Sequence, residues 1–158
     1  MTCAVAADTK LETPEGPLTV KTVGTAATAV MTRTDDGAIR FAMSSAVEKL
    51  SEQQPVLRIA LSNGRALRVG AAQVLLGRDG TRYVAGELAA GDRLLDAFAF
   101  RVGYEYRTDA GETCLSDGCV AVVSVAPAGD ADVYALRVAR TGRFVFSAGI
   151  IGLDSDQL

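Results

Sequence analysis

Histidine is absent from all 158 residues of the chain, as is tryptophan. Imidazole is the side chain that proteins use most often to move protons near neutral pH, because its unperturbed pKa is about 6.5. Any acid–base chemistry in this protein must therefore rely on carboxylates, thiols, hydroxyls or amides.

Cysteine is scarce, with three residues in the chain. An odd number argues against a disulfide framework of the secreted type, so we expect a cytoplasmic protein. Cys114 and Cys119 flank a glycine-containing turn, an arrangement that fits either a reversible disulfide or the commoner pair of unlinked cysteines. Three cysteines without histidine do not complete the four-ligand set of a structural zinc site, and no phosphate-binding glycine motif begins a helix. We expect no metal and no cofactor.

Long apolar runs are missing too, since the longest fall far short of the ~20 residues that span a bilayer. The amino terminus also lacks the basic and apolar segments of a signal peptide. Sixteen Lys and Arg residues are scattered along the chain against nineteen Asp and Glu, giving a net charge of −3. We therefore expect a soluble, untargeted chain that binds neither nucleic acid nor membrane.

What the chain does have is enough apolar sequence for a core. Apolar residues make up 49% of the composition. At this length, such a composition predicts one compact domain over residues 1–158 that folds without disulfide or metal support. We expect it to be a monomer.

The strongest local signal is a hairpin in the middle of the chain. Residues 56–61 and 65–69 alternate apolar and polar side chains on either side of Asn63-Gly64. Asn-Gly between two such runs predicts a β-hairpin with a primed turn, because both residues tolerate positive φ.

Alternation and turn residues elsewhere predict many short strands, which is typical of an all-β fold. A serine-capped helix ended by Pro55 is predicted at residues 44–50. Turns are predicted at residues 35–37 and 127–130. The remaining predicted strands are residues 18–23, 27–33, 39–43, 74–76, 81–84, 97–106 with one or two bends at Gly103, 119–126 and 132–138. A turn at residues 140–143 is followed by a strand that begins at Phe144-Val145.

The middle of the chain resembles the central block of the Hint superfamily, the hedgehog and intein autoprocessing modules. The resemblance rests on Gly64-Arg65-x-Leu67-x-Val69, followed by a glycine turn, a short aromatic strand and Glu87-Leu88-x-x-Gly91-Asp92. In the family a Thr and a His follow the first strand. Here those two positions hold Gly70 and Gln73.

Both ends of the chain are similar to inteins as well. Cys3, Asp8-Thr9 and Pro14-Glu15-Gly16 match the amino-terminal block in type and order. The closing block is matched by a Val-Tyr-x-Leu strand and a Phe-Val strand. Where inteins end in His-Asn and a downstream residue, this chain has Leu153, Asp154 and Ser155. The resemblance implies a flattened, pseudo-twofold β fold with a module core at residues 3–154 and no endonuclease domain.

The resemblance also implies a chemistry. The Cys3 thiolate would attack the carbonyl of Thr2 and convert an amide into a thioester. Gln73 and Gly70 would occupy the assisting positions. Because glutamine forms hydrogen bonds but transfers no proton, the rate should fall by the ~10²–10⁴-fold that general acid catalysis provides.

At the downstream junction, the resemblance gives the attack on the backbone carbonyl to the Asp154 carboxylate, and Ser155 becomes the first residue of the flank. Splicing needs both junctions in one site, so Cys3 and Asp154 should lie within ~10 Å of each other. Simpler interpretations exist for both ends. Cys3 can be a small buried apolar residue, and Asp154-Ser155 an ordinary polar tail.

Two functions therefore follow from the sequence. The first is an intein-like autoprocessing module, slow or impaired, that acts on its flanking polypeptide. The alternative is a Hint domain that has lost catalysis and serves as a structural or protein-binding module in a larger assembly. The missing histidine favours the second, and the retained Cys3 and Asp154-Ser155 favour the first.

Overall fold

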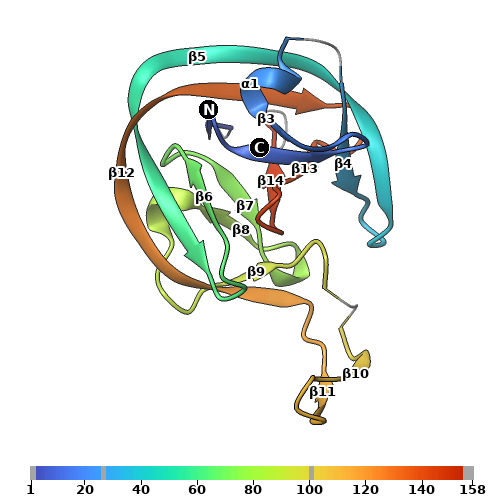
Figure 1. Cartoon of the computed structure of the whole chain (residues 1–158). Helices are drawn as coiled ribbons and strands as arrows, with labels where there is room; N and C mark the ends of the chain where they lie inside the picture. Colours follow the sequence, from blue (N-terminus) through green and yellow to red (C-terminus); the bar gives the residue numbers. More distant parts are fainter. Residues whose placement is uncertain (1–2, 26–27, 100–101, 155–158) are drawn as a thin grey trace.

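Strands dominate the computed structural model, which describes residues 3–25, 28–99 and 102–154 (Figure 1). In chain order the elements are β1 (Val5–Ala6), β2 (Lys10–Thr13), β3 (Gly16–Thr19), α1 (Val20–Val23), β4 (Ala29–Arg33), β5 (Ile39–Leu61), β6 (Ala66–Val69), β7 (Val74–Leu76), η1 (Arg78–Gly80), β8 (Arg82–Val84), η2 (Ala85–Glu87), β9 (Arg93–Leu95), β10 (Glu105–Arg107), β11 (Thr113–Leu115), β12 (Cys119–Val138), β13 (Arg143–Val145) and β14 (Ile151–Leu153). The predicted all-β class is confirmed.

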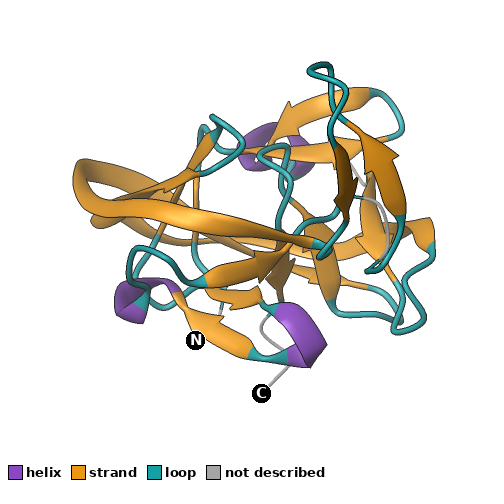
Figure 2. Ribbon diagram, turned by 90° about the horizontal axis from the view of Figure 1, so that it is seen from below, coloured by secondary structure: helices purple, strands orange, loops and turns teal. Residues whose placement is uncertain are grey.

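The strands are organised in two larger sheets and two hairpins. The six-stranded sheet has the order β4-β5-β6-β1-β12-β9, and β5 and β12 also pair directly with each other. The four-stranded sheet has the order β13-β14-β7-β8, and β2–β3 and β10–β11 form separate pairs. In Figure 1, β5 and β12 arch together around the other strands, while β10 and β11 project away from them. Helix is confined to short segments (Figure 2).

The helix predicted at residues 44–50 is wrong, because this segment lies inside the long strand β5. Residues along it pair with β12, as in the cross-strand pair Val47–Leu136. Seven residues are too few for a stable helix on their own, so sheet pairing outweighs the local preference. Nothing in the segment's own sequence indicates this partner, which lies about ninety residues away.

Pro55 does not end an element either. It stays within β5, exposed to solvent and opposite Asp130. The turn predicted around Pro127 is likewise absorbed into β12, where the pairing register shifts. Gln53 and Gly129 have positive φ, 48° and 76°. Bulges of this kind let a strand pair bend without ending, which explains the arch of β5 and β12.

The hairpin predicted around Asn63-Gly64 is confirmed as β5–β6, with a different turn. Leu61 donates its N–H to the Arg65 carbonyl at 2.9 Å, so the loop comprises residues 62–64. Only Gly64 has positive φ, at 83°. This is the three-residue hairpin loop that ends in a left-handed glycine, rather than the primed two-residue turn.

The strand predicted at residues 18–23 is wrong in its second half, where the chain forms the single turn α1. The Thr19 hydroxyl accepts a hydrogen bond from the Thr22 N–H at 3.2 Å and caps this turn. Val20 and Val23, three positions apart, are both buried by it. The cap and the apolar spacing together favour helix over the alternation that predicted strand.

The strand predicted at residues 97–106 is mostly wrong. An Asp96 carboxylate oxygen accepts hydrogen bonds from the N–H groups of Phe98 and Ala99, and this bends the backbone. Among the described residues of this stretch, only those of β10 form a strand, which pairs with β11 in the projecting hairpin. Its neighbours Val102 and Tyr104 are about half exposed.

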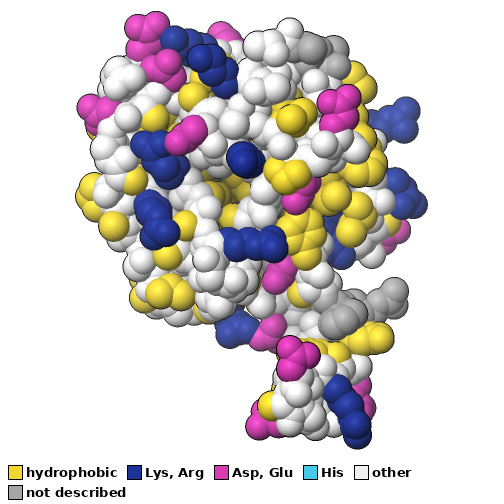
Figure 3. All heavy atoms as spheres, viewed as in Figure 1, with side chains coloured by type: hydrophobic (Ala, Val, Ile, Leu, Met, Phe, Trp, Pro, Cys, Tyr) yellow, Lys and Arg dark blue, Asp and Glu magenta, His cyan; other side chains and the backbone are white. Residues whose placement is uncertain are grey.

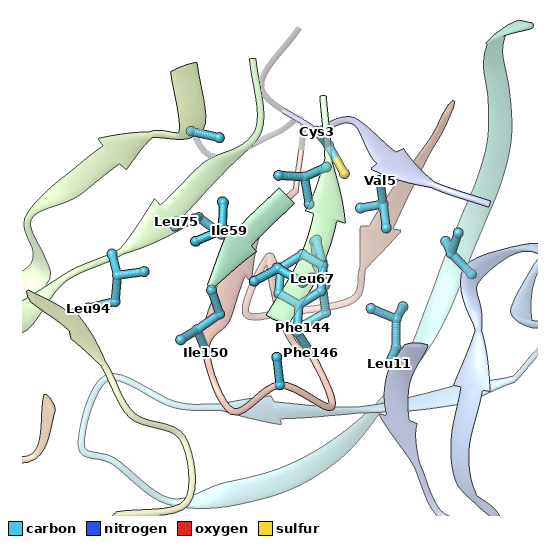
Figure 4. Packing of buried hydrophobic residues seen from close by; sticks show 14 of the residues in the cluster. Cys3, Val5, Leu11, Ile59, Leu67, Leu75, Leu94, Phe144, Phe146 and Ile150 are labelled. Atoms are coloured by element: carbon cyan, nitrogen blue, oxygen red, sulfur yellow. The ribbon is translucent and has the colours of Figure 1, made fainter. Parts of the chain in front are cut away.

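The core lies between the sheets and is closed by the carboxyl-terminal strands (Figure 4). Phe144 and Phe146 meet edge to face with ring centroids 5.1 Å apart. Leu11, Ile59 and Ile150 pack in the same cluster and are fully buried. None of the helices in the described part of the chain has the length and apolar character that crossing a membrane requires.

Candidate functional site

Cys3 lies at the start of the described chain, immediately before β1, and its side chain belongs to the hydrophobic core. It is fully buried, and Figure 4 shows its sulfur at the edge of the cluster, close to Val5. Burial raises the pKa of the thiol to about 12, since an apolar surrounding disfavours the thiolate. A backbone hydrogen bond from Leu136 opposes this shift, and the negative charge of Asp154 adds to it.

Gln73 is the centre of the site. It lies in the turn between β6 and β7 and is fully buried. Its Oε1 accepts a hydrogen bond from the Ala4 N–H at 2.9 Å, and its Nε2 donates to the carbonyls of Val74 at 2.8 Å and Leu153 at 3.2 Å. One amide group therefore joins the residue after Cys3 to the residue before Asp154.

Backbone contacts fix the position of that amide. The Gln73 N–H donates to the Gly70 carbonyl at 3.1 Å, and the Gln73 carbonyl accepts from the Ala85 N–H at 2.8 Å. Because the turn is held on both sides, the Gln73 side chain enters the core in one direction. Its polar atoms are buried with partners, which removes the cost of burying an unpaired amide.

Asp154 follows β14 and is almost completely buried. Its Oδ2 accepts a hydrogen bond from the Val138 N–H at 2.9 Å, and its own N–H donates to the Gly142 carbonyl at 2.9 Å. A buried carboxylate is tolerated only with such hydrogen bonds. The end of β12 thus holds the downstream junction, while its neighbour Leu136 contacts the upstream thiol.

Gly70 contributes backbone groups, and no side chain, to the site. Its N–H donates to the Ala4 carbonyl at 2.7 Å. A Cβ placed on Gly70 would lie 2.8 Å from the Cβ of Ala4, closer than such atoms approach in real structures. The threonine that the family has at this position therefore does not fit beside Ala4 without a shift of the backbone.

The structure brings together four of the five residues singled out from the sequence, namely Cys3, Gly70, Gln73 and Asp154. The fifth, Ser155, lies outside the described residues. Cys114 and Cys119 are both free, so the disulfide alternative is not realised. Among the described residues, no three cysteine or carboxylate side chains gather as a metal site would require.

Sequence reasoning missed the backbone groups that complete the site. They are the N–H groups of Ala4, Leu136 and Val138, and the carbonyls of Gly142 and Leu153. Every residue except proline has both an N–H and a carbonyl, so residue identity carries little signal for them. Their positions depend on tertiary structure, such as the pairing of β12 with β1 that brings Leu136 near Cys3.

In chemical terms, the site can hold two chain ends in fixed register, with the side chains of Cys3, Gln73 and Asp154 buried. It contains a nucleophile of low thiolate content, a neutral hydrogen-bonding amide and a carboxylate. Proton transfer by imidazole is absent from it.

Comparisons with known proteins point in one direction. No protein-family model and no curated protein sequence matches the chain. Solved structures do match: a G-1F mutant of the Ssp DnaB mini-intein variant M86, with a TM-score of 0.74 and 19% identity over 96% of this chain and 98% of that one. The DnaB intein of Synechocystis sp. PCC 6803 matches with a TM-score of 0.71 and 17% identity, over 96% of this chain and 98% of that one.

A bacterial intein-like domain from Clostridium thermocellum has a TM-score of 0.75 and 15% identity over 98% of this chain and all of that one. At such identities the likeness concerns the fold. The likeness covers nearly the whole of this chain and of each matched structure. The chain therefore has the Hint fold of the mini-inteins, as its three sequence blocks indicated.

Proposed function

We propose that this chain, as a single domain with a core at residues 3–154, is an intein-like autoprocessing module that acts slowly on its flanking polypeptide. The observation that carries the proposal is the Gln73 amide, which hydrogen-bonds the backbone at both chain ends. A domain that served only as a scaffold would have no need to fix its two ends against one buried side chain. Autoprocessing does need this, because reacting groups must be held in one site.

In the upstream step, the Cys3 sulfur attacks the carbonyl carbon of Thr2. A carbon–sulfur bond forms, the carbon–nitrogen bond to Cys3 breaks, and the proton of the thiol ends on the released amine. The products are a thioester and a free α-amine. Gln73 holds the Ala4 N–H, and so positions the peptide that follows the scissile bond.

Two features make this step slow. With a thiol pKa of about 12, only about one molecule in 10⁵ carries the thiolate at pH 7. In addition, Gln73 donates hydrogen bonds without transferring a proton to the leaving nitrogen. Gly70 contributes only its backbone, where the family has a threonine hydroxyl.

In the downstream step, a carboxylate oxygen of Asp154 attacks the carbonyl carbon of its own residue. A cyclic anhydride forms, the carbon–nitrogen bond to Ser155 breaks, and the leaving nitrogen takes a proton from water. The hydrogen bond from Val138 to Oδ2 holds this carboxylate in place. Leu153, in the position of the family histidine, supplies no proton to the leaving amine.

The test uses the chain fused at each end to a folded reporter protein, with intact mass as the readout. We expect the parent to remain full length for a day at pH 7 and to release the upstream reporter slowly in added thiol. Gln73→His should accelerate that release by a factor within the ~10²–10⁴ range of general acid catalysis. Gly70 is kept, because Ala4 leaves no room for a side chain there.

Cys3→Ala in the same fusion is the control and should release nothing. Spontaneous loss of the upstream reporter within minutes would contradict the slow step. A folded Gln73→His variant with no thiol-dependent release would favour the alternative function, a Hint domain without catalysis that serves as a structural or protein-binding module.

A further inference from the structure

A hollow of about 470 Å³ lies on the outer face of the β5–β6 hairpin. The segment before β2 and the loop between β13 and β14 form its other walls. In the space-filling view, Lys and Arg side chains stand around a depression in this face (Figure 3). We call it the arginine hollow; its charged and hydroxyl-bearing residues include Asp8, Lys10, Arg58, Arg65, Arg68 and Ser147.

The arginine hollow is strongly basic within an acidic chain. Four cations and one carboxylate line it, an excess of three positive charges, whereas the whole chain has a net charge of −3. Such local concentration is not expected from the scattered bases of the sequence. It is created by the fold, which brings residues 8–10, 58–68 and 147–148 together.

Two of these cations face each other across the hairpin. Arg58 and Arg68 are directly paired in the β5–β6 register. Like charges at such positions repel. Arg68 is compensated by Asp8 at 2.7 Å and by the Ala128 carbonyl at 3.0 Å. Among the described residues, the Arg58 guanidinium has no hydrogen-bond or ion-pair partner, so Asp8 offsets the charge of Arg68 while the charge of Arg58 is not offset.

A hydroxyl in the wall also lacks a partner. Ser147 Oγ is buried and makes no hydrogen bond with the described residues. The backbone around it is fixed, because its N–H donates to the Lys10 carbonyl at 3.0 Å and its carbonyl accepts from Arg65 at 3.2 Å. A buried hydroxyl without a partner is uncommon and costs stability. Ser147 also lines the hollow, so a small rotation of its hydroxyl would offer a ligand one more donor.

We propose that the arginine hollow binds a small molecule that carries a phosphate monoester. Planar guanidinium groups pair with phosphate through two parallel hydrogen bonds, and Arg58 presents such a group without a partner among the described residues. Arg65, Arg68 and Lys10 line the same hollow and add positive charge. A dianionic phosphate matches the excess of positive charge better than a single carboxylate does. The volume exceeds that of a bare phosphate, and Ala66, Leu67 and Ala148 provide apolar lining for the organic group.

This site is separate from the Cys3–Gln73–Asp154 cluster and does not depend on autoprocessing. The probes are phenyl phosphate, inorganic phosphate and benzoate, titrated at low salt and followed by calorimetry and by NMR shifts of the β5–β6 amides. We expect phenyl phosphate to bind more tightly than inorganic phosphate. Benzoate, which has the same ring and a single charge, should bind at least about tenfold more weakly.

Arg58→Gln should weaken phenyl phosphate binding by roughly tenfold or more, the loss expected for one charge-assisted contact. Arg58→Lys keeps the charge without the planar fork and should lie between Arg58→Gln and the parent. The matched control is Arg107→Gln, an exposed arginine on the projecting β10–β11 hairpin, which should bind like the parent.

Three results would overturn the proposal. The first is no phenyl phosphate binding to the parent at millimolar concentration. The second is benzoate binding as tight as phenyl phosphate binding, which would make the ligand a carboxylate. The third is an equal loss in Arg58→Gln and Arg107→Gln, which would indicate general charge attraction. Since Arg58 is exposed, its variants should keep the parent's circular dichroism spectrum.

Discussion

The two polar regions of this molecule are organised in opposite ways. In the junction cluster, formed by Cys3, Gln73 and Asp154, the side chains are buried, and Gln73 and Asp154 hydrogen-bond to backbone groups of the same chain. In the arginine hollow, Arg58 is exposed and has no partner among the described residues. The polar groups of Gln73 and Asp154 thus have partners within the chain, whereas the charge of Arg58 has none among the described residues.

This difference separates two kinds of function. A closed cluster suits chemistry on the chain itself, because its substrate is already covalently attached and solvent needs to be excluded. An open basic hollow suits a ligand that comes and goes. Variants in the two regions should therefore have opposite effects on stability, and the predictions below test that contrast.

The largest effect is expected for Gln73→Ala. It removes three hydrogen bonds, leaves a cavity, and strands buried backbone groups of Ala4 and Leu153, so the free energy of unfolding should fall by roughly 4–6 kcal/mol. Urea denaturation measures this change in the free energy of unfolding, with the same m-value used for parent and variant. Gln54→Ala, at an exposed position, should change it by less than about 0.5 kcal/mol. A loss below about 1 kcal/mol for Gln73→Ala would contradict a closed cluster.

The second effect concerns alkaline pH. The folded-state pKa of the Cys3 thiol is about 12, above its ordinary value of 9.0, so the folded state keeps the proton longer than the unfolded state does. The associated stability is fully present below pH 9 and is lost as pH rises towards 12. By linkage, the free energy of unfolding is about 2 kcal/mol lower at pH 10.5 than below pH 9 because of this one thiol.

The measurement is urea denaturation of the parent and of Cys3→Ala at pH 8 and pH 10.5. Loss of lysine and tyrosine protons contributes to both proteins, so only the difference between their pH dependences reports on Cys3. Equal dependences would mean that the thiol is not desolvated, and the contrast between the two regions would weaken.

The smallest effect has the opposite sign. Arg58→Gln removes the repulsion across the hairpin from Arg68, and should raise the free energy of unfolding by up to about 0.5–1 kcal/mol at low salt. High salt should abolish this gain, since exposed charges are screened. The control is Arg107→Gln, which should be neutral in the same denaturation series. A loss of stability in Arg58→Gln would indicate that Arg58 stabilises the free protein.

The sequence predicted the parts of the fold that are decided locally or by family pattern. Asn63-Gly64 predicted the β5–β6 hairpin. The amino-terminal, central and closing sequence blocks, which occur in the order found in inteins, indicated the Hint fold. Local patterns failed where distant pairing decides. Residues 44–50 became strand because β12 lies beside them, and Pro55 lies within a bend that needs both strands.

The candidate site was predictable to the extent that it consists of side chains. Gln73 was indicated because it holds the position of the family His after the β6 strand, and Asp154 because it holds the position of the family Asn in the closing block. The arginine hollow was not predicted, because its cations are scattered along the sequence and only the sheet register places Arg58 opposite Arg68. Scattered charge in a sequence is thus compatible with concentrated charge on a surface.

Under the proposed function, the hydrogen bonds of Gln73 also determine when the protein can act. They reach 69 residues back to Ala4 and 80 residues forward to Leu153, and the thiol at residue 3 is contacted by the backbone of Leu136. Contacts between residues so distant in sequence form late in folding, because the intervening chain must first lose conformational entropy. During synthesis, Cys3 leaves the ribosome more than 130 residues before Leu136 and about 150 before Asp154. If Cys3 is the nucleophile as proposed, a nascent chain therefore holds an inert cysteine until its last strand is in place, and completion of the fold starts the reaction.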